Sequence, residues 1–222
     1  MSDVLFEDWG LIDYSESLRR QLERVESVAQ SNRAQAGYLI FCTHPPVVTI
    51  GRQTQTSDFL NWKGPVVEVS RGGRATYHGP SQLVVYPIIN LQYPRKGRSS
   101  QEVRGFIRDL ESALVNTLKI YNLQANGRTP QKKDAESPAA DETGVWIGNK
   151  KIASIGIAVK KWITFHGAAV NLDSDSTAFQ GLKPCGFEPS TMTCLEDLLG
   201  KKINREEFKK NLLHELNELL IG

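Results

Sequence analysis

The sequence predicts a mixed α/β domain, and three observations support this fold class. The chain has 222 residues and 40% hydrophobic content, enough to bury a core, and mixed α/β domains often reach this length. Apolar residues recur at helical spacing near both ends and in the middle of the chain. Between these segments lie short apolar runs bounded by glycine and proline, which are typical of strands. We therefore expect one domain over residues 1–222.

A helix and two strands are expected first. Leucine and valine residues recur at helical spacing over residues 12–29, and Asp13 or Ser15 can cap this helix. Strand-like runs follow at residues 38–42 and 47–50. Two prolines separate these runs and cannot donate hydrogen bonds to a sheet, so the chain turns there.

A loop rich in glycine, arginine and aromatic side chains follows the next expected strand, residues 66–69. It reads RGGRATYHGP over residues 71–80 and leads into a strand at 83–91, with a rigid turn expected where YHGP stands. Gly72 and Gly73 let the backbone approach a ligand or adopt positive φ. A plain connection needs neither the double glycine nor the histidine, so we interpret this loop as a binding site. Its glycines match no nucleotide-binding fingerprint.

A second helix is expected over residues 99–121, where apolar residues form one stripe and Ser99 or Ser100 can cap the first turn. The residues that follow are polar and poor in large apolar side chains. We interpret them as an exposed loop at about 124–143.

The remaining elements are three strands and two helices. Residues 144–149, 151–159 and 162–172 have strand-like patterns joined by short turns, which favours a meander. A short helical pattern ends at Gly200, and a final amphipathic helix begins near Arg205.

Composition and charge exclude several classes of protein. A net charge of +2 is too small for a typical nucleic-acid-binding surface. Three cysteines, an odd number, argue against a disulfide framework, and the N-terminal sequence lacks a signal-peptide pattern. No apolar run is long enough to span a bilayer. We expect a cytoplasmic protein that binds neither nucleic acid nor membrane.

Lys151 is a candidate base because it begins an apolar strand. Alternate residues of a strand share a face, so Lys151 is expected to point with Ala153, Ile155, Ile157 and Val159. Burial disfavours the charged ammonium form, so a lysine in such company can accept a proton. A lysine at a strand end can also extend to water, and the residues alone leave both readings open.

Cys185 is a candidate nucleophile because Pro184 and Gly186 would display it on a turn. Backbone N–H groups beside the thiol could stabilise a thiolate and a tetrahedral oxyanion. A structural cysteine is the alternative, and it is the reading we adopt for Cys42 and Cys194.

The histidines and cysteines do not predict a metal site. None of the recognised ligand spacings occurs among His44, His78, His166, Cys42, Cys185 and Cys194. His44 precedes two prolines and could line a site or serve a structural role.

Five segments together resemble the lipoyl(octanoyl) transferase family. They are HPPVVTIGR at 44–52, RGGRATYHGPSQ at 71–82, KIASIGIA at 151–158, FHGAAVNL at 165–172 and KPCGF at 183–187. They occur in the family's order and span most of the chain. Ser81 stands where the family more often has glycine, and the segment 128–143 is longer than usual.

The resemblance implies transfer of an octanoyl or lipoyl group from acyl carrier protein to a lysine of a lipoyl domain. The acceptors would be 2-oxoacid dehydrogenase E2 subunits and the glycine-cleavage H protein. It also implies an α/β fold of the α+β type, a mixed sheet flanked by helices, similar to lipoate- and biotin-protein ligase catalytic domains. We expect a monomer with no bound cofactor and no use of ATP.

The resemblance also assigns site residues. Cys185 would form a thioester with the acyl group, and Lys151 would take the thiol proton. The acyl-binding segments would contribute Arg71, Gly72, Gly73, Arg74, Ala75, Thr76, Tyr77, His78, Ser154, Ile155, Gly156, His166, Gly167, Ala168 and Ala169. Their small residues suit an apolar slot for an eight-carbon chain, since each buried CH₂ contributes roughly 0.8 kcal/mol.

Other readings compete with this one. An amidotransferase would move acyl groups between proteins on the same fold, and an ATP-using lipoate ligase would not need Cys185. A non-catalytic acyl-binding protein is a third possibility, and the presence of both Lys151 and Cys185 in their motifs argues against it.

Overall fold

The computed structural model describes residues 4–31, 36–95, 97–129 and 140–221. Its strands are β1 (Val4–Leu11), β2 (Gly37–Thr43), β3 (Val47–Ile50), β4 (Val66–Glu68), β5 (Thr76–His78), β6 (Gln82–Ile89), β7 (Asn126–Gly127), β8 (Gly144–Ile147), β9 (Lys150–Lys160) and β10 (Ile163–Asn171). Its helices and 3-10 turns are α1 (Tyr14–Gln30), η1 (Thr56–Asp58), α2 (Val103–Ile120), η2 (Pro184–Gly186), η3 (Pro189–Thr191), α3 (Leu195–Leu199) and α4 (Arg205–Leu220).

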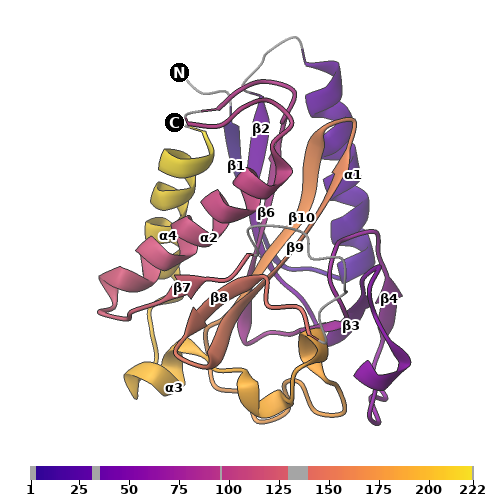
Figure 1. Cartoon of the computed structure of the whole chain (residues 1–222), viewed down its shortest axis with the longest axis vertical. Helices are drawn as coiled ribbons and strands as arrows, with labels where there is room; N and C mark the ends of the chain where they lie inside the picture. The colour runs from indigo at the N-terminus through magenta and orange to yellow at the C-terminus, as the bar shows by residue number, and fades with distance from the viewer. Residues whose placement is uncertain (1–3, 32–35, 96, 130–139, 222) are drawn as a thin grey trace.

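The described residues form a central sheet between helices. This seven-stranded sheet has the order β1-β2-β6-β10-β9-β8-β7, and β1 is parallel to β2 while the other pairs are antiparallel. Helices α2 and α4 cover one face and α1 covers the other (Figure 1). A three-stranded sheet with the order β4-β3-β5 lies near one end of α1. The predicted mixed sheet flanked by helices is confirmed.

Local capping decides where the first two long helices begin. The carboxylate of Asp13 accepts two backbone N–H groups of the first turn of α1, at 2.8 and 3.2 Å, as its sequence predicts. Helix α2 begins later than expected, with Glu102 at its N-cap, so the prediction that Ser99 or Ser100 caps it is wrong. Gln101 has a left-handed backbone with φ 62°, which prevents the helix from extending back toward the serines.

Three strands lie where the sequence predicts none. Strand β1 lacks a clear period-two pattern and is at the sheet edge, with Leu5 and Leu11 exposed. Strand β5 occupies part of the expected YHGP turn. Strand β7, with the buried Ala125 before it, lies within the segment expected to be an exposed loop. Residues 130–139 of that loop lie outside the described residues.

Candidate active site

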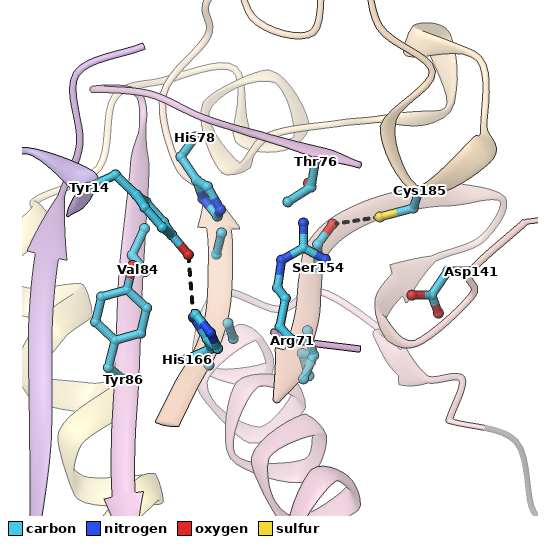
Figure 2. A pocket seen from close by; sticks show the side chains of 15 residues that line it. Tyr14, Arg71, Thr76, His78, Val84, Tyr86, Asp141, Ser154, His166 and Cys185 are labelled. Atoms are coloured by element: carbon cyan, nitrogen blue, oxygen red, sulfur yellow. Dashed lines mark hydrogen bonds between the residues drawn. The ribbon is translucent and has the colours of Figure 1, made fainter. Parts of the chain in front are cut away.

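A narrow cavity lies where the strands β6, β9 and β10 meet α1 and the turn η2. Its volume is about 30 Å³, room for roughly two water molecules. The lining residues are Tyr14, Arg71, Thr76, His78, Val84, Tyr86, Asp141, Ser154, Ile155, Gly156, His166, Gly167, Ala168, Ala169 and Cys185. Figure 2 shows Cys185 and Asp141 on one side of it and Tyr14, Tyr86 and His166 on the other. The cavity therefore lies between the turn that carries Cys185 and helix α1.

Cys185 is held on a strained turn. Its backbone is left-handed, with φ 55° and ψ 19°, a conformation that costs a residue with a Cβ about 1 kcal/mol or more. The N–H of Cys185 donates to the carbonyl of Ala75 at 2.8 Å, and the N–H of Gly186 donates to the carbonyl of Lys183 at 3.0 Å. The expectation that free amide donors flank the thiol is therefore wrong, because these N–H groups hold the turn in place.

Ser154 is the hydrogen-bond partner of the Cys185 thiol. Its Oγ lies 3.7 Å from Sγ of Cys185 (Figure 2), and within the described ranges no other polar atom hydrogen-bonds that sulfur. The sulfur is buried, since Cys185 is only 5% exposed. Strand β9 thus fixes the direction in which the thiol points.

Lys151 lies on the same sheet face as Ser154 because β9 contains a bulge. The pairing of β8 with β9 shifts register after Val145, which leaves Ile152 as an extra residue. Ile152 and Ala153 both pack in the core cluster beneath α2. Lys151, which precedes them, therefore points to the opposite face of the sheet, the face that Ser154 shares. The prediction that Lys151 points with Ala153 and its alternate neighbours is wrong for this reason.

The Lys151 side chain is completely buried beside the cysteine turn. Its Nζ donates to the carbonyl oxygen of Asp141 at 2.7 Å and lies 5.6 Å from the ring centroids of Trp146 and Phe187. The N–H of Asp141 in turn donates to the carbonyl of Cys185 at 2.8 Å. Among the described residues no hydrogen bond joins Nζ directly to the sulfur. The two predicted catalytic residues are thus connected through the backbone of one intervening residue.

A second local distortion turns His166 into the cavity. Strict alternation along β10 would place His166 with Ala168, on the α2 side of the sheet. Its left-handed backbone, φ 58°, instead turns the ring toward α1, where Nδ1 lies 3.3 Å from the hydroxyl of Tyr14. The backbone N–H of His166 donates to Oε1 of Gln21 at 2.8 Å. Helix α1 therefore stabilises the distortion.

The end of the cavity opposite Cys185 is polar but uncharged. Burial lowers the pKa of His166 to about 3, and the charge of Arg71 lowers it further in the same direction. Burial also lowers the pKa of His78 well below its usual value and raises the pKa of Tyr14 to about 12. Both histidines are therefore neutral at physiological pH. Nε2 of His166 is buried and has no hydrogen-bond partner among the described residues, so it is available to a ligand.

His44 has the structural role that the sequence left open. Its Nδ1 donates to the carbonyl of Ile12 at 2.8 Å, so Nε2 of the neutral ring accepts the hydroxyl of Tyr86 at 2.7 Å. Burial lowers the pKa of His44, which maintains this neutral form. Both ring nitrogens are occupied, and His44 supports Tyr86 at the cavity wall.

Arg71 crosses the cavity and organises the glycine-rich loop. Its guanidinium donates to the carbonyls of Gly72, Arg74 and Thr49 at 2.9 to 3.0 Å and to Oγ1 of Thr49 at 2.7 Å. A Cβ at Gly156 would lie 2.8 Å from Cδ of Arg71. Gly156 is therefore needed so that the arginine can lie flat on β9.

Five predicted binding residues do not line the cavity: Gly72, Gly73, Arg74, Ala75 and Tyr77. Lys151, predicted as catalytic, does not line it either. Arg74 is buried and pairs with Asp58, its Nε 3.2 Å from Oδ2, and a Cβ at Gly186 would lie 2.7 Å from its Cζ. Arg74 therefore packs against the nucleophile turn. Tyr77 points into a separate aromatic cluster that includes Phe179.

Four lining residues were not predicted: Tyr14, Val84, Tyr86 and Asp141. Tyr14 and Val84 read as ordinary helix and strand residues, and Tyr86 as part of an apolar run. Asp141 lies in a segment whose polar composition indicated only an exposed loop. No local pattern could have found them, because the site joins parts of the chain that are distant in sequence.

Two kinds of feature are absent from residues 4–31, 36–95, 97–129 and 140–221. No group of three or more histidine, cysteine, aspartate or glutamate side chains there could hold a metal ion. None of the helices in these ranges has the length and apolar character needed to cross a membrane.

Comparison with known proteins identifies the class of this fold and site. A family model for the lipoyl protein ligase A/B catalytic domain matches residues 13–217. A bi-partite lipoate protein ligase from Thermoplasma acidophilum, analysed with its E2 lipoyl domain, superposes with a TM-score of 0.71 at 18% identity, over 99% of this chain and 84% of that one. Aquifex aeolicus biotin protein ligase, in complex with biotin and ATP, has a TM-score of 0.56 at 14% identity, over 99% and 71%. These structures share the fold.

Sequence relatives identify the family. An octanoyltransferase of Bdellovibrio bacteriovorus is 52% identical over 221 residues, which are 99% of this chain and 100% of the relative. An octanoyltransferase of Orientia tsutsugamushi is 35% identical over 213 residues, 94% and 95% of the two chains. The chain belongs to the octanoyltransferase family and is an acyltransferase of protein lipoylation.

Proposed function

We propose that the chain transfers an octanoyl group from acyl carrier protein to a lysine of a lipoyl domain, through a thioester on Cys185. The observation that carries this proposal is the position of Cys185, whose thiol faces a narrow cavity from a strained turn and contacts Ser154. Strained backbone at a buried nucleophile is typical of a residue kept for chemistry rather than stability. The octanoyltransferase relatives support the acyl group.

In the first half of the proposed reaction, Lys151 takes the thiol proton and the Cys185 thiolate attacks the octanoyl thioester. The C–S bond to phosphopantetheine breaks, and Lys151 returns the proton to the departing thiol. Nζ and Sγ share no hydrogen bond in the described structure, so the proton passes through a water molecule or after a shift of the lysine side chain. Both groups adjoin the same residue, Asp141, which makes either route short.

In the second half, the lysine of the lipoyl domain attacks the acyl-enzyme and an amide forms. Exchange of one thioester for another is nearly balanced in free energy, whereas formation of the amide from a thioester is downhill. The second half therefore drives the reaction, and we propose that neither ATP nor a bound cofactor is needed.

The octanoyl chain would lie along the cavity from Cys185 toward Tyr14 and His166. The small residues Gly156, Ala168 and Ala169 line this path. The present volume of about 30 Å³ is too small for eight carbons, so side chains must move when the acyl group enters. Burial of the chain would contribute roughly 0.8 kcal/mol per CH₂ and offset the cost of that movement.

The proposed partners are octanoyl-acyl carrier protein as donor, with E2 lipoyl domains and the glycine-cleavage H protein as acceptors. Action as a monomer in the cytoplasm, without nucleic acid or membrane, remains a prediction from the sequence.

The ATP-using ligase reading is tested by supplying octanoyl-carrier protein and an apo lipoyl domain with no nucleotide present. We expect the lipoyl domain to gain an octanoyl group, detected by its mass. A strict requirement for ATP would overturn the transferase proposal in favour of a ligase on the same fold. A Cys185→Ser variant is the control, and it should transfer nothing.

A further inference from the structure

We infer that the Asp141 carboxylate binds the ε-ammonium of the acceptor lysine beside Cys185 and is the first acceptor of its proton. This inference rests on the proposed acyl-enzyme and adds a catalytic residue to its second half. No sequence motif or resemblance pointed to Asp141.

The backbone of Asp141 is fixed by both predicted catalytic residues. Its N–H donates to the carbonyl of Cys185 at 2.8 Å, and its carbonyl accepts Nζ of Lys151 at 2.7 Å. These two contacts hold the Cα of Asp141 at the reactive end of the cavity. A shift of the Cys185 carbonyl or of the Lys151 side chain would therefore also shift the backbone of Asp141.

The side chain of Asp141 is also constrained. Oδ1 accepts the backbone N–H of Thr143 at 3.0 Å. Oδ2 occupies the space that a Cβ at Gly73 would fill, so the left-handed glycine makes room for it. Figure 2 shows Asp141 on the Cys185 side of the cavity. One carboxylate oxygen thus accepts the N–H of Thr143, while the other lies against the backbone of Gly73.

The negative charge of the Asp141 carboxylate can attract the positively charged lysine of the acceptor. Among the described residues that line the cavity, Asp141 is the only acidic one, and no lysine or arginine side chain in the described ranges forms an ion pair with it. The side chain is partly exposed, whereas Lys151 is fully buried. An ammonium approaching Cys185 would otherwise meet the positive charge of Arg71, which lines the cavity, so the carboxylate offsets that repulsion.

The acceptor ammonium must lose two protons in the reaction, and the Asp141 carboxylate accepts the first of them. As the amine becomes an amide, a C–N bond forms, the C–S bond to Cys185 breaks, and the original ammonium loses two protons. One proton passes to Asp141 before attack and leaves to water from the exposed side. The second leaves the tetrahedral adduct and ends on the sulfur of Cys185. Lys151 regains no net proton, and the enzyme returns to its starting state.

The test separates the two half-reactions in an Asp141→Asn variant, which keeps both backbone contacts and the acceptor for Thr143. Glu142→Gln is the matched control, because Glu142 is adjacent and exposed. We expect octanoyl-carrier protein to acylate Cys185 in Asp141→Asn at a rate within about twofold of wild type. Transfer to an apo lipoyl domain should be slower by about tenfold or more, so the acyl-enzyme accumulates. The control should show neither effect.

A second readout distinguishes catalysis from structure. Hydroxylamine is uncharged near neutral pH, whereas n-butylamine is cationic, and both can resolve the acyl-enzyme. We expect Asp141→Asn to slow cleavage by n-butylamine and to leave cleavage by hydroxylamine unchanged. Equal slowing of both nucleophiles, or an unchanged rate of transfer, would overturn the inference. Absence of an acyl-enzyme in the wild-type protein would instead overturn the proposed function on which the inference rests.

Discussion

Lys151 donates from Nζ to the carbonyl oxygen of Asp141 at 2.7 Å, deep in a site where the lysine is fully buried. Burial of a lysine side chain costs free energy unless polar or aromatic groups interact with its amine. Here a strand bulge, two aromatic rings and a backbone carbonyl surround the Lys151 side chain. These features keep the amine next to the cysteine turn.

Replacement of this lysine should make the thiol less reactive. We expect Lys151→Ala to slow alkylation of Cys185 by iodoacetamide about tenfold near pH 7, because the thiol keeps its proton. Lys150→Ala is the control, since Lys150 is exposed and its Nζ contacts the carbonyl of Ser190. Alkylation rates measured from pH 6 to pH 10 with about equal profiles in wild type and Lys151→Ala would contradict the role of Lys151 as base.

The strained backbone of Cys185 predicts a difference between two variants that both lack the thiol. Cys185→Gly should be more stable than Cys185→Ala by about 1 kcal/mol, because glycine adopts φ 55° without a steric penalty. Urea unfolding of the two purified proteins measures the difference. Equal unfolding free energies would mean that the turn is not strained.

Two glycines of the predicted acyl-binding segments should tolerate alanine very differently. A Cβ at Gly167 would clash with the carbonyl oxygen of Val85 on the neighbouring strand, whereas a Cβ at Gly72 meets only the Ile157 carbonyl oxygen, at 3.8 Å. We expect Gly167→Ala to lower the unfolding free energy by about 2 kcal/mol or more and Gly72→Ala by less than about 1 kcal/mol. Similar losses in the two variants would contradict the close approach of β10 to β6.

The neutral histidines predict a loss of stability in acid. Because the pKa of His166 is lowered to about 3, the unfolded chain binds more protons than the folded chain between that pH and the ordinary value of 6.5. The stability due to neutral His166 is complete above pH 6.5 and is lost as the pH falls toward 3, at up to about 1.4 kcal/mol per pH unit.

Unfolding free energies at several pH values from 7.5 to 5 test this expectation. His166→Gln should reduce the slope of stability against pH, and His214→Gln, at an exposed position of α4, should leave it unchanged. A slope that is the same in wild type and His166→Gln would show that His166 takes up its proton in the folded state.

The fold was largely predictable because most elements have a local signature. The cap at Asp13, the apolar stripe of α2 and the runs that form β9 and β10 are all visible in the residues themselves. Strand β1 was not, because it lies at the sheet edge with a mixed burial pattern and is stabilised by pairing with β2.

The site was predictable only as a set of residues. The bulge at Ile152 and the left-handed backbone of His166 each break the rule of alternating faces, and both depend on contacts with other elements. Asp141 is held in the site by hydrogen bonds to Lys151, ten positions further along the chain, and to Cys185, forty-four positions further along. Such relations cannot be read from spacing, so the orientation of each group required the structure.

The central claim is that Cys185 carries the acyl group. Its most direct test is intact-mass spectrometry of the full chain after brief mixing with octanoyl-carrier protein, followed by peptide mapping. We predict one octanoyl adduct on Cys185, which is absent from Cys185→Ser and present in Cys194→Ser. An adduct that maps to Cys194, or a folded wild-type protein that forms none, would contradict the account.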